Sequence, residues 1–265
     1  MGATGNQRFS SLFISHGAPT LPLSDLPSRT FLMELGRELP RPKAIVAVSP
    51  HWLTRERAVK SPSRFAIWHD FHGFPEALYS LRYEASGDAA LGERVCELLA
   101  RAGLAAMASG DARLDHGVWV PLLLMYPEAD VPVVQVSATW DTPRDYHALG
   151  RALAPLAADG VLLLGSGGFV HNLREIEFDS DRVPGWAREF AGWTDARLRE
   201  NDWDALFEYR SHAPQAERAH PTEDHFLPLF FAGGAGGAGG AGATATRLHD
   251  SFAHGSLSMA AYGFR

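Results

Sequence analysis

The sequence contains a single cysteine, Cys96, and therefore cannot form a disulfide within the chain. Disulfides are typical of oxidising compartments, so this content fits a reducing cytoplasm, where we expect the protein to reside. No run of about 18 apolar residues is present, and the N-terminal residues lack the apolar segment of a signal peptide. We therefore expect neither a membrane span nor a membrane partner.

The chain also lacks an excess of basic residues. Lys and Arg number 24 against 31 Asp and Glu, and the formal net charge is -7. Nucleic-acid-binding proteins usually present a basic patch, so we expect no nucleic-acid partner and favour a small-molecule substrate. The length of 265 residues fits one domain over residues 1–265, as a monomer or small homo-oligomer.

Short apolar runs alternate with helical patterns along the chain. The runs predict buried strands at Leu12–Ile14, Ala44–Val48, Val131–Val136 and Val161–Leu164. The helical patterns lie at Thr30–Leu39, Asp88–Ala102, Arg144–Ala158, Val183–Asn201 and Thr222–Ala232. This alternation predicts a single α/β domain with a mostly parallel, doubly wound sheet flanked by helices.

Two glycine-rich segments call for an interpretation. The sequence GGAGGAGGAG at 233–242 predicts a flexible Gly/Ala-rich surface loop. The sequence VLLLGSGG, which begins at Val161, resembles a dinucleotide-binding turn. However, Val170 occupies the position of the last glycine of that fingerprint, which argues against a nucleotide cofactor.

Twelve histidines are an unusual feature of this chain. His16, His51 and His171 each follow a predicted strand within a few residues. The carboxyl ends of parallel strands meet at one crevice, so these three side chains are expected to converge there. A lone histidine is more often a core or surface residue, but the shared position favours a site. Imidazole binds zinc, copper and iron, and catalytic metal sites commonly use three protein ligands.

Two further segments offer candidate ligands. In HPTEDHFLPLFF, His220 and His225 are five residues apart and would point about 140° apart on a helix. One of them is therefore the expected ligand. Pro221 fits a first helical turn, which would place His220 at the helix entrance. His116 stands in a loop-like stretch before a buried apolar run.

Six segments together resemble the DODA-type extradiol aromatic ring-opening dioxygenases, which are relatives of 4,5-DOPA dioxygenase and of the catalytic subunit of protocatechuate 4,5-dioxygenase. The resemblance runs from about residue 11 to the C-terminus. The matching segments are FISHGAP (13–19), SPHW (49–52), HDFHGFPEALYSLRY (69–83), LDHGVWVPLLLMYPEADVPVVQVS (114–137), GSGGFVHNLRE (165–175) and HPTEDHFLPLFFAGGA (220–235).

The resemblance implies one metal ion at the base of a cleft. His16 and His51 match the first two ligands. The third comes from the HPTEDHF segment, where the register favours His225. His220 is then a residue of the substrate pocket, although the opposite assignment stays open.

Two more histidines receive roles by the same resemblance. His171 matches the acid–base histidine of the family and stands close enough to the metal to count as a possible further ligand. His116 matches the histidine that faces substrate or dioxygen. Trp52 and Trp119 are expected to stack on the substrate ring, with plain core packing as the alternative.

The implied reaction is extradiol cleavage of a catechol by O2 with Fe(II). An all-histidine site also suits Zn(II), which has no redox chemistry, so zinc in the purified protein would leave it inactive. Two alternatives use the same site: a zinc-dependent hydrolase, for which no HExxH motif is present, and a non-catalytic metal-binding relative. Oxygen uptake with a catechol separates the dioxygenase from both.

Overall fold

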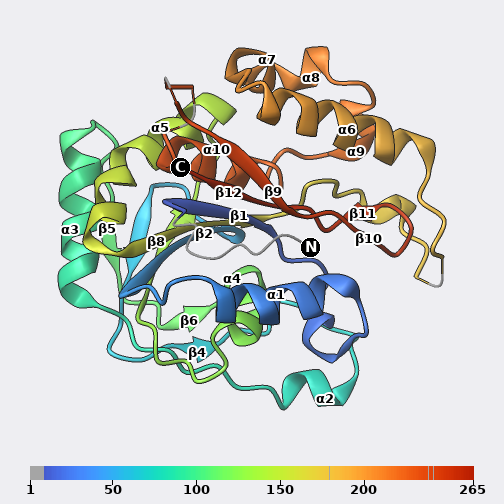
Figure 1. The fold of residues 1–265 in the computed structure, drawn as a ribbon. Coiled ribbons are helices and arrows are strands. Elements are labelled where there is room, and N and C mark those ends of the chain that lie inside the picture. The colour runs from blue at the N-terminus through green and yellow to red at the C-terminus, as the bar shows by residue number, and fades with distance from the viewer. Residues whose placement is uncertain (1–8, 179, 238, 241) are drawn as a thin grey trace.

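The computed structural model describes residues 9–178, 180–237, 239–240 and 242–265. Residues 1–8, which form most of the segment expected to lack a signal peptide, lie outside this range. A twisted sheet runs through the middle of the molecule and is covered by helices on both faces (Figure 1). The predicted α/β class with a mostly parallel sheet is therefore confirmed.

The main sheet has eight strands in the order β5-β3-β7-β2-β8-β1-β12-β9. The four central strands are parallel; three of them contain predicted apolar runs, and the fourth, β7, overlaps the run Val131–Val136 from Val133 onward. On either side of these four, β3 and β12 run antiparallel to their inner neighbours. The strands span β1 Ser11–Ser15, β2 Ala44–Leu53, β3 Ala58–Lys60, β5 Met107–Ser109, β7 Val133–Ala138, β8 Val161–Gly167, β9 Ala245–His249 and β12 Ala261–Phe264.

The central strands are apolar along their length because each face packs on its own core. Phe13 and Val46 point into one core, whereas their neighbours Leu12 and Ile45 point into the other. Such alternation follows from the two-residue period of a strand. The first core lies under α3 Ala89–Arg101, α5 Pro143–Leu153, α6 Gly185–Arg199 and α10 Leu227–Ala235, and the second lies under α1 Pro27–Glu38 and α4 His116–Met125.

Helix starts follow local capping signals. The Asp88 carboxylate accepts the Leu91 backbone N–H at 2.9 Å, and Thr142 forms a capping box with Asp145 at the start of α5. No helix in the described part of the chain is long and apolar enough to cross a membrane. The shorter elements are η1 Leu21–Leu23, β4 Ala66–Ile67, α2 Glu76–Tyr79, β6 Arg113–Leu114, η2 Ala154–Asp159, η3 Leu173–Glu175, α7 Trp203–Phe207, α8 Tyr209–His212, α9 Ala216–Ala219, β10 Phe252–Ala253 and β11 Leu257–Ser258.

The last predicted helix and the predicted glycine loop both require correction. Residues 221–226 form bends and turns, and α10 begins only at Leu227, with Pro228 rather than Pro221 in its first turn. At its other end, α10 continues through Gly233 and Gly234, both buried. The first part of the predicted flexible loop is therefore helical. The reason is close packing, because a Cβ on Gly234 would overlap the backbone carbonyl of His147 in α5.

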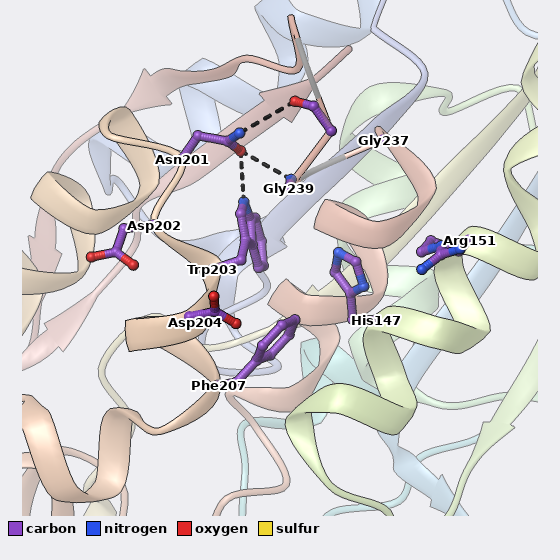
Figure 2. Close-up of a pocket in the computed structure, with 10 residues that line it drawn as sticks. His147, Arg151, Asn201, Asp202, Trp203, Asp204, Phe207, Gly237 and Gly239 are labelled. Carbon is purple, nitrogen blue, oxygen red and sulfur yellow. Dashed lines mark hydrogen bonds between the residues drawn. The ribbon is translucent and has the colours of Figure 1, made fainter.

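Trp203 of α7 packs against the first of these glycines, Gly233. A hollow of about 560 Å³ lies beside Trp203, between α5 and α7. Figure 2 shows the residues that line it and the hydrogen bonds that join Asn201 to Trp203 and Gly239. The Trp203 indole N–H donates to the Asn201 side-chain oxygen at 3.0 Å. A Cβ on Gly233 would overlap the Trp203 ring. Glycine in this segment thus serves helix packing.

Replacing Gly233 with alanine is therefore expected to destabilise the fold by about 1–3 kcal/mol, as overpacking a well-filled core does. The measurement is the free energy of unfolding in urea. Gly192→Ala is the matched control, because Gly192 lies exposed in α6 with open space around its Cα. That change should be neutral or stabilising by about 0.5–1 kcal/mol. Equal stability of Gly233→Ala and wild type would contradict the packing argument.

Candidate metal centre

Three histidines from distant parts of the chain bring their Nε2 atoms together. His16 directly follows β1, His51 lies near the end of β2, and His225 lies two residues before α10. The Nε2 of His51 is 3.1 Å from that of His16 and 3.2 Å from that of His225. The β2–β7 ladder is irregular between Ser49 and Leu53, and His51 lies in this irregular stretch. Such irregularities re-aim side chains near active sites.

These distances match those of ligands around one metal ion. Two nitrogens bound about 2.1 Å from the same ion lie roughly 3.0–3.4 Å apart at right or tetrahedral angles. All three rings are largely buried, with His16 1% and His225 7% exposed. Buried nitrogen lone pairs that face each other without a cation would repel. The donor set and its spacing therefore fit a metal ion.

Hydrogen bonds at the opposite ring nitrogens orient two of these imidazoles. The Nδ1 of His16 lies 3.0 Å from the Ser166 hydroxyl, which itself donates to the Gly117 carbonyl. Ser166 therefore accepts from Nδ1–H. The Nδ1 of His225 lies 2.5 Å from the Asp224 carboxylate, which can only accept. Both bonds leave an unprotonated Nε2 that points into the cluster, the form that binds metals.

A fourth histidine, His116, lies against the rings of His16 and His51. It is the first residue of α4, and its ring centroid lies 3.9 Å from that of His51. Asp70 accepts from its Nδ1 at 2.8 Å and from its backbone N–H at 3.1 Å. Nitrogen atoms of His16, His51 and His116 all lie within 4.8 Å of one another, so these three form a second possible ligand set.

His171 and His220 occupy different surroundings. His171 lies four residues after β8, is half-buried, and stacks flat on His225 with ring centroids 3.5 Å apart. His220 is fully buried, and its Nε2–H donates to the Phe169 carbonyl at 3.2 Å, whereas its Nδ1 has no hydrogen-bond partner among the described residues. Its ring packs on Phe226 at 4.7 Å between centroids. The structure thus places His220 in the core beside Phe226, and its role as a residue of the substrate pocket stays a prediction.

The two tryptophans expected at the substrate pack elsewhere. Trp52 follows His51 in β2, and its ring centre lies 4.0 Å from the Lys60 ammonium. Trp119 is fully buried, and its indole N–H donates to the Trp68 carbonyl at 3.2 Å. Core packing, the alternative interpretation, describes both. Among the described aromatic residues, Phe71 is the one whose ring contacts His116, at 5.7 Å between centroids.

Burial lowers the pKa of the clustered imidazoles, and neighbouring imidazoles lower it further. The pKa values of His16 and His225 lie well below the usual range. That of His51 falls to about 3, although Asp70 opposes the shift, and that of His171 falls to about 4. These histidines are therefore neutral near pH 7, as metal ligands must be.

The same shifts make the metal-free protein sensitive to acid. Unfolded histidines bind a proton near pH 6.5, whereas the folded ones resist it until about pH 3–4. The contribution of these histidines to the free energy of unfolding is therefore fully present above pH 6.5. It decreases as the pH falls below that value, by about 1.4 kcal/mol per pH unit for each such group. Urea unfolding of metal-free protein between pH 7.5 and 5.5 measures this loss. Constant stability across that range would contradict the burial of neutral imidazoles.

Comparisons with known proteins agree with this geometry. Residues 11–265 match the family model of the catalytic LigB subunit of aromatic ring-opening dioxygenase. A 4,5-DOPA dioxygenase extradiol from Beta vulgaris is 38% identical and aligns over 100% of this chain and 99% of its own length. The enzyme of that name from Escherichia coli K12 is 39% identical over 86% of this chain and 85% of its own. The crystal structure of an uncharacterized protein from Escherichia coli K12 superposes with a TM-score of 0.78 at 33% identity, covering 95% of this chain and 98% of that one.

The fold and the histidine cluster thus define a metal-dependent enzyme that opens aromatic rings with O2. The chain belongs to the LigB family of aromatic ring-opening dioxygenases and is an extradiol ring-cleaving dioxygenase. Its substrate is a small aromatic molecule. The hydrolase and the non-catalytic alternatives are set aside by this membership.

The sequence interpretation missed the residues that orient the imidazoles. Each of three residues accepts a hydrogen bond from the Nδ1–H of one histidine: Asp70 from His116, Asp224 from His225 and Ser166 from His16. All three lie in segments that were singled out: Asp70 in HDFHGFPEALYSLRY, Ser166 in GSGGFVHNLRE and Asp224 in HPTEDHFLPLFFAGGA. Metal-bound histidines usually donate their second N–H to a carboxylate or carbonyl, so acidic residues in the matched motifs were the available signal.

Proposed function

We propose that the enzyme holds Fe(II) on His16, His51 and His225 and cleaves a DOPA-like catechol at an extradiol bond. The convergence of the three Nε2 atoms at 3.1 and 3.2 Å is the observation that supports this ligand set. His225 is preferred to His116 as the third ligand because its Nε2 meets that of His51 directly. The 4,5-DOPA names of the relatives suggest the substrate class.

Held by His16, His51 and His225, Fe(II) would supply the redox chemistry of the reaction between the catechol and dioxygen. His171 lies against His225 and is neutral, so it accepts a phenolic proton at an imidazole nitrogen. Asp70 accepts the Nδ1–H of His116 and so fixes how this ring faces the cluster. From there the imidazole can form a hydrogen bond to oxygen charge that develops in the reaction.

The test is anaerobic loading of metal-stripped protein with Fe(II) or Zn(II), followed by air and a panel of DOPA, protocatechuate, caffeate and catechol. We expect oxygen uptake and a yellow ring-opened product with Fe(II), none with Zn(II), and the highest kcat/KM with DOPA. Hydrolysis of an ester by the zinc form, without product from any catechol, would overturn the proposal. A preference for protocatechuate would overturn only the assignment of the substrate.

A further inference from the structure

We propose that Asp115 is a positioning residue for the metal centre, because its buried carboxylate joins the segment that carries His51 to the segment that carries His116. The inference rests on the proposed function, since it concerns how the proposed ligands are held. Asp115 touches neither metal nor substrate. Its role would be to fix the distance between the end of β2, which carries His51, and the start of α4, which carries His116.

The carboxylate of Asp115 is completely buried and accepts two short hydrogen bonds. Its Oδ1 accepts from the Ser49 hydroxyl at 2.7 Å, and its Oδ2 accepts from the Gln135 amide at 2.6 Å. The Ser49 oxygen in turn accepts the backbone N–H of His51 at 3.3 Å. The carboxylate therefore fixes the irregular end of β2, where regular ladder bonds do not hold His51.

The backbone of the same residue begins the helix that carries His116. Asp115 is the N-cap of α4, and its carbonyl accepts from the N–H groups of Val118 and Trp119, both at 3.0 Å. His116 is the next residue, so its ring position depends on where Asp115 is held. One side chain thus sets the relative position of two neighbouring imidazoles, whose centroids are 3.9 Å apart.

The following glycine extends the connection to the first ligand. A Cβ on Gly117 would overlap the Ser49 hydroxyl and lie 3.0 Å from the His51 ring, so the helix start approaches β2 as closely as its backbone allows. The Gly117 carbonyl accepts from Ser166, which orients His16. Residues 115–117 therefore contact the supports of His16 and His51 and contain His116.

Burial of the Asp115 carboxylate raises its pKa, and the hydrogen bonds from Gln135 and Ser49, together with the charge of Lys60, oppose that rise. Lys60 is fully buried in β3, in register with Gln135 of β7. Its ammonium lies 3.6 Å from an Asp111 carboxylate oxygen and 4.0 Å from the Trp52 ring centre. The two hydrogen bonds and this charge therefore offset part of the cost of burying the carboxylate.

The test is Asp115→Asn, which keeps the size of the side chain but places an N–H donor against a neighbouring donor. We expect metal affinity to fall by about 10–100-fold, as for other residues that support ligands. The measurement is competition between metal-stripped full-length protein and a chromophoric chelator for Zn(II), which needs no turnover. Ser49→Ala removes only the connection to His51 and should lower affinity in the same direction by a smaller factor.

Asp195→Asn is the matched control, because Asp195 is a buried carboxylate that accepts from the Tyr262 hydroxyl at 2.7 Å, away from the histidines. It should lower the Tm and leave the Kd for Zn(II) unchanged. Unchanged Kd values in both Asp115→Asn and Ser49→Ala would overturn the positioning role, and Ser49→Ala alone decides if the first variant does not fold. Wild-type protein that fails to bind Zn(II) would instead contradict the proposed metal centre.

Discussion

Replacing His171 with alanine is expected to lower kcat by about 10²–10⁴-fold, the usual contribution of a general acid–base residue. The stacked position of His171 on His225 places it beside the proposed ligand set. Burial lowers its pKa to about 4, so the imidazole is neutral at pH 7 and keeps a free nitrogen lone pair that can take the proton. Metal content should stay near that of wild type, because the Nε2 atoms of His16, His51 and His225 are unaffected.

Steady-state kinetics with Fe(II)-loaded protein and metal analysis by mass spectrometry measure both quantities in one preparation. His212→Ala serves as the control, since this histidine is exposed in α8. Loss of metal together with activity would show that His171 is a ligand. Unchanged turnover would show that another group takes the phenolic proton.

A second prediction distinguishes His225 from His116 as the third ligand beside His16 and His51. His225→Ala is expected to lose the metal, with a fall in affinity beyond the roughly 10–100-fold expected for a supporting residue. His116→Ala should keep the metal and lower kcat, because His116 is assigned to the oxygen that gains charge. Both variants remove one imidazole from the same buried cluster, so they control for each other.

Metal titration of the stripped variants, read as a change in Tm, gives the answer without turnover. A ligand that binds only the folded state raises the Tm, and a variant without affinity shows no rise. Retention of metal by His225→Ala and loss by His116→Ala would assign the centre to His16, His51 and His116 instead. That outcome would leave the family membership intact.

The apolar runs of the central strands could be predicted because both faces of these strands are buried. The outer strands β3, β5, β9 and β12 could not, since each has only three to five residues and too few of them are apolar to form a recognisable run. The segment before α10 was predicted as helix from its apolar residues, but composition does not fix where a helix begins. The glycines at 233 and 234 suggested a loop, although glycine also permits two helices to touch.

The metal centre, too, could be predicted only in part from the sequence. His16 and His51 could be predicted because strand ends in a parallel sheet share one edge. The roles of Asp70 and Asp115 could not, because each depends on contacts between residues far apart in the sequence: Asp70 with His116, and Asp115 with Ser49 and Gln135. His220 and His225 look alike in the sequence. They differ only in which one the turn before α10 directs toward His51.

The wide spacing of the three proposed ligands has a consequence for how the enzyme matures. His16 and β1 are made before His225, and β12, which pairs with β1, is made after His225. A growing chain thus exposes histidines long before their common centre exists. Domains fold as units during synthesis, so metal acquisition has to be a late event that follows closure of the sheet. The supply of the metal in the cell would then set the active fraction of finished molecules rather than the yield of folded ones.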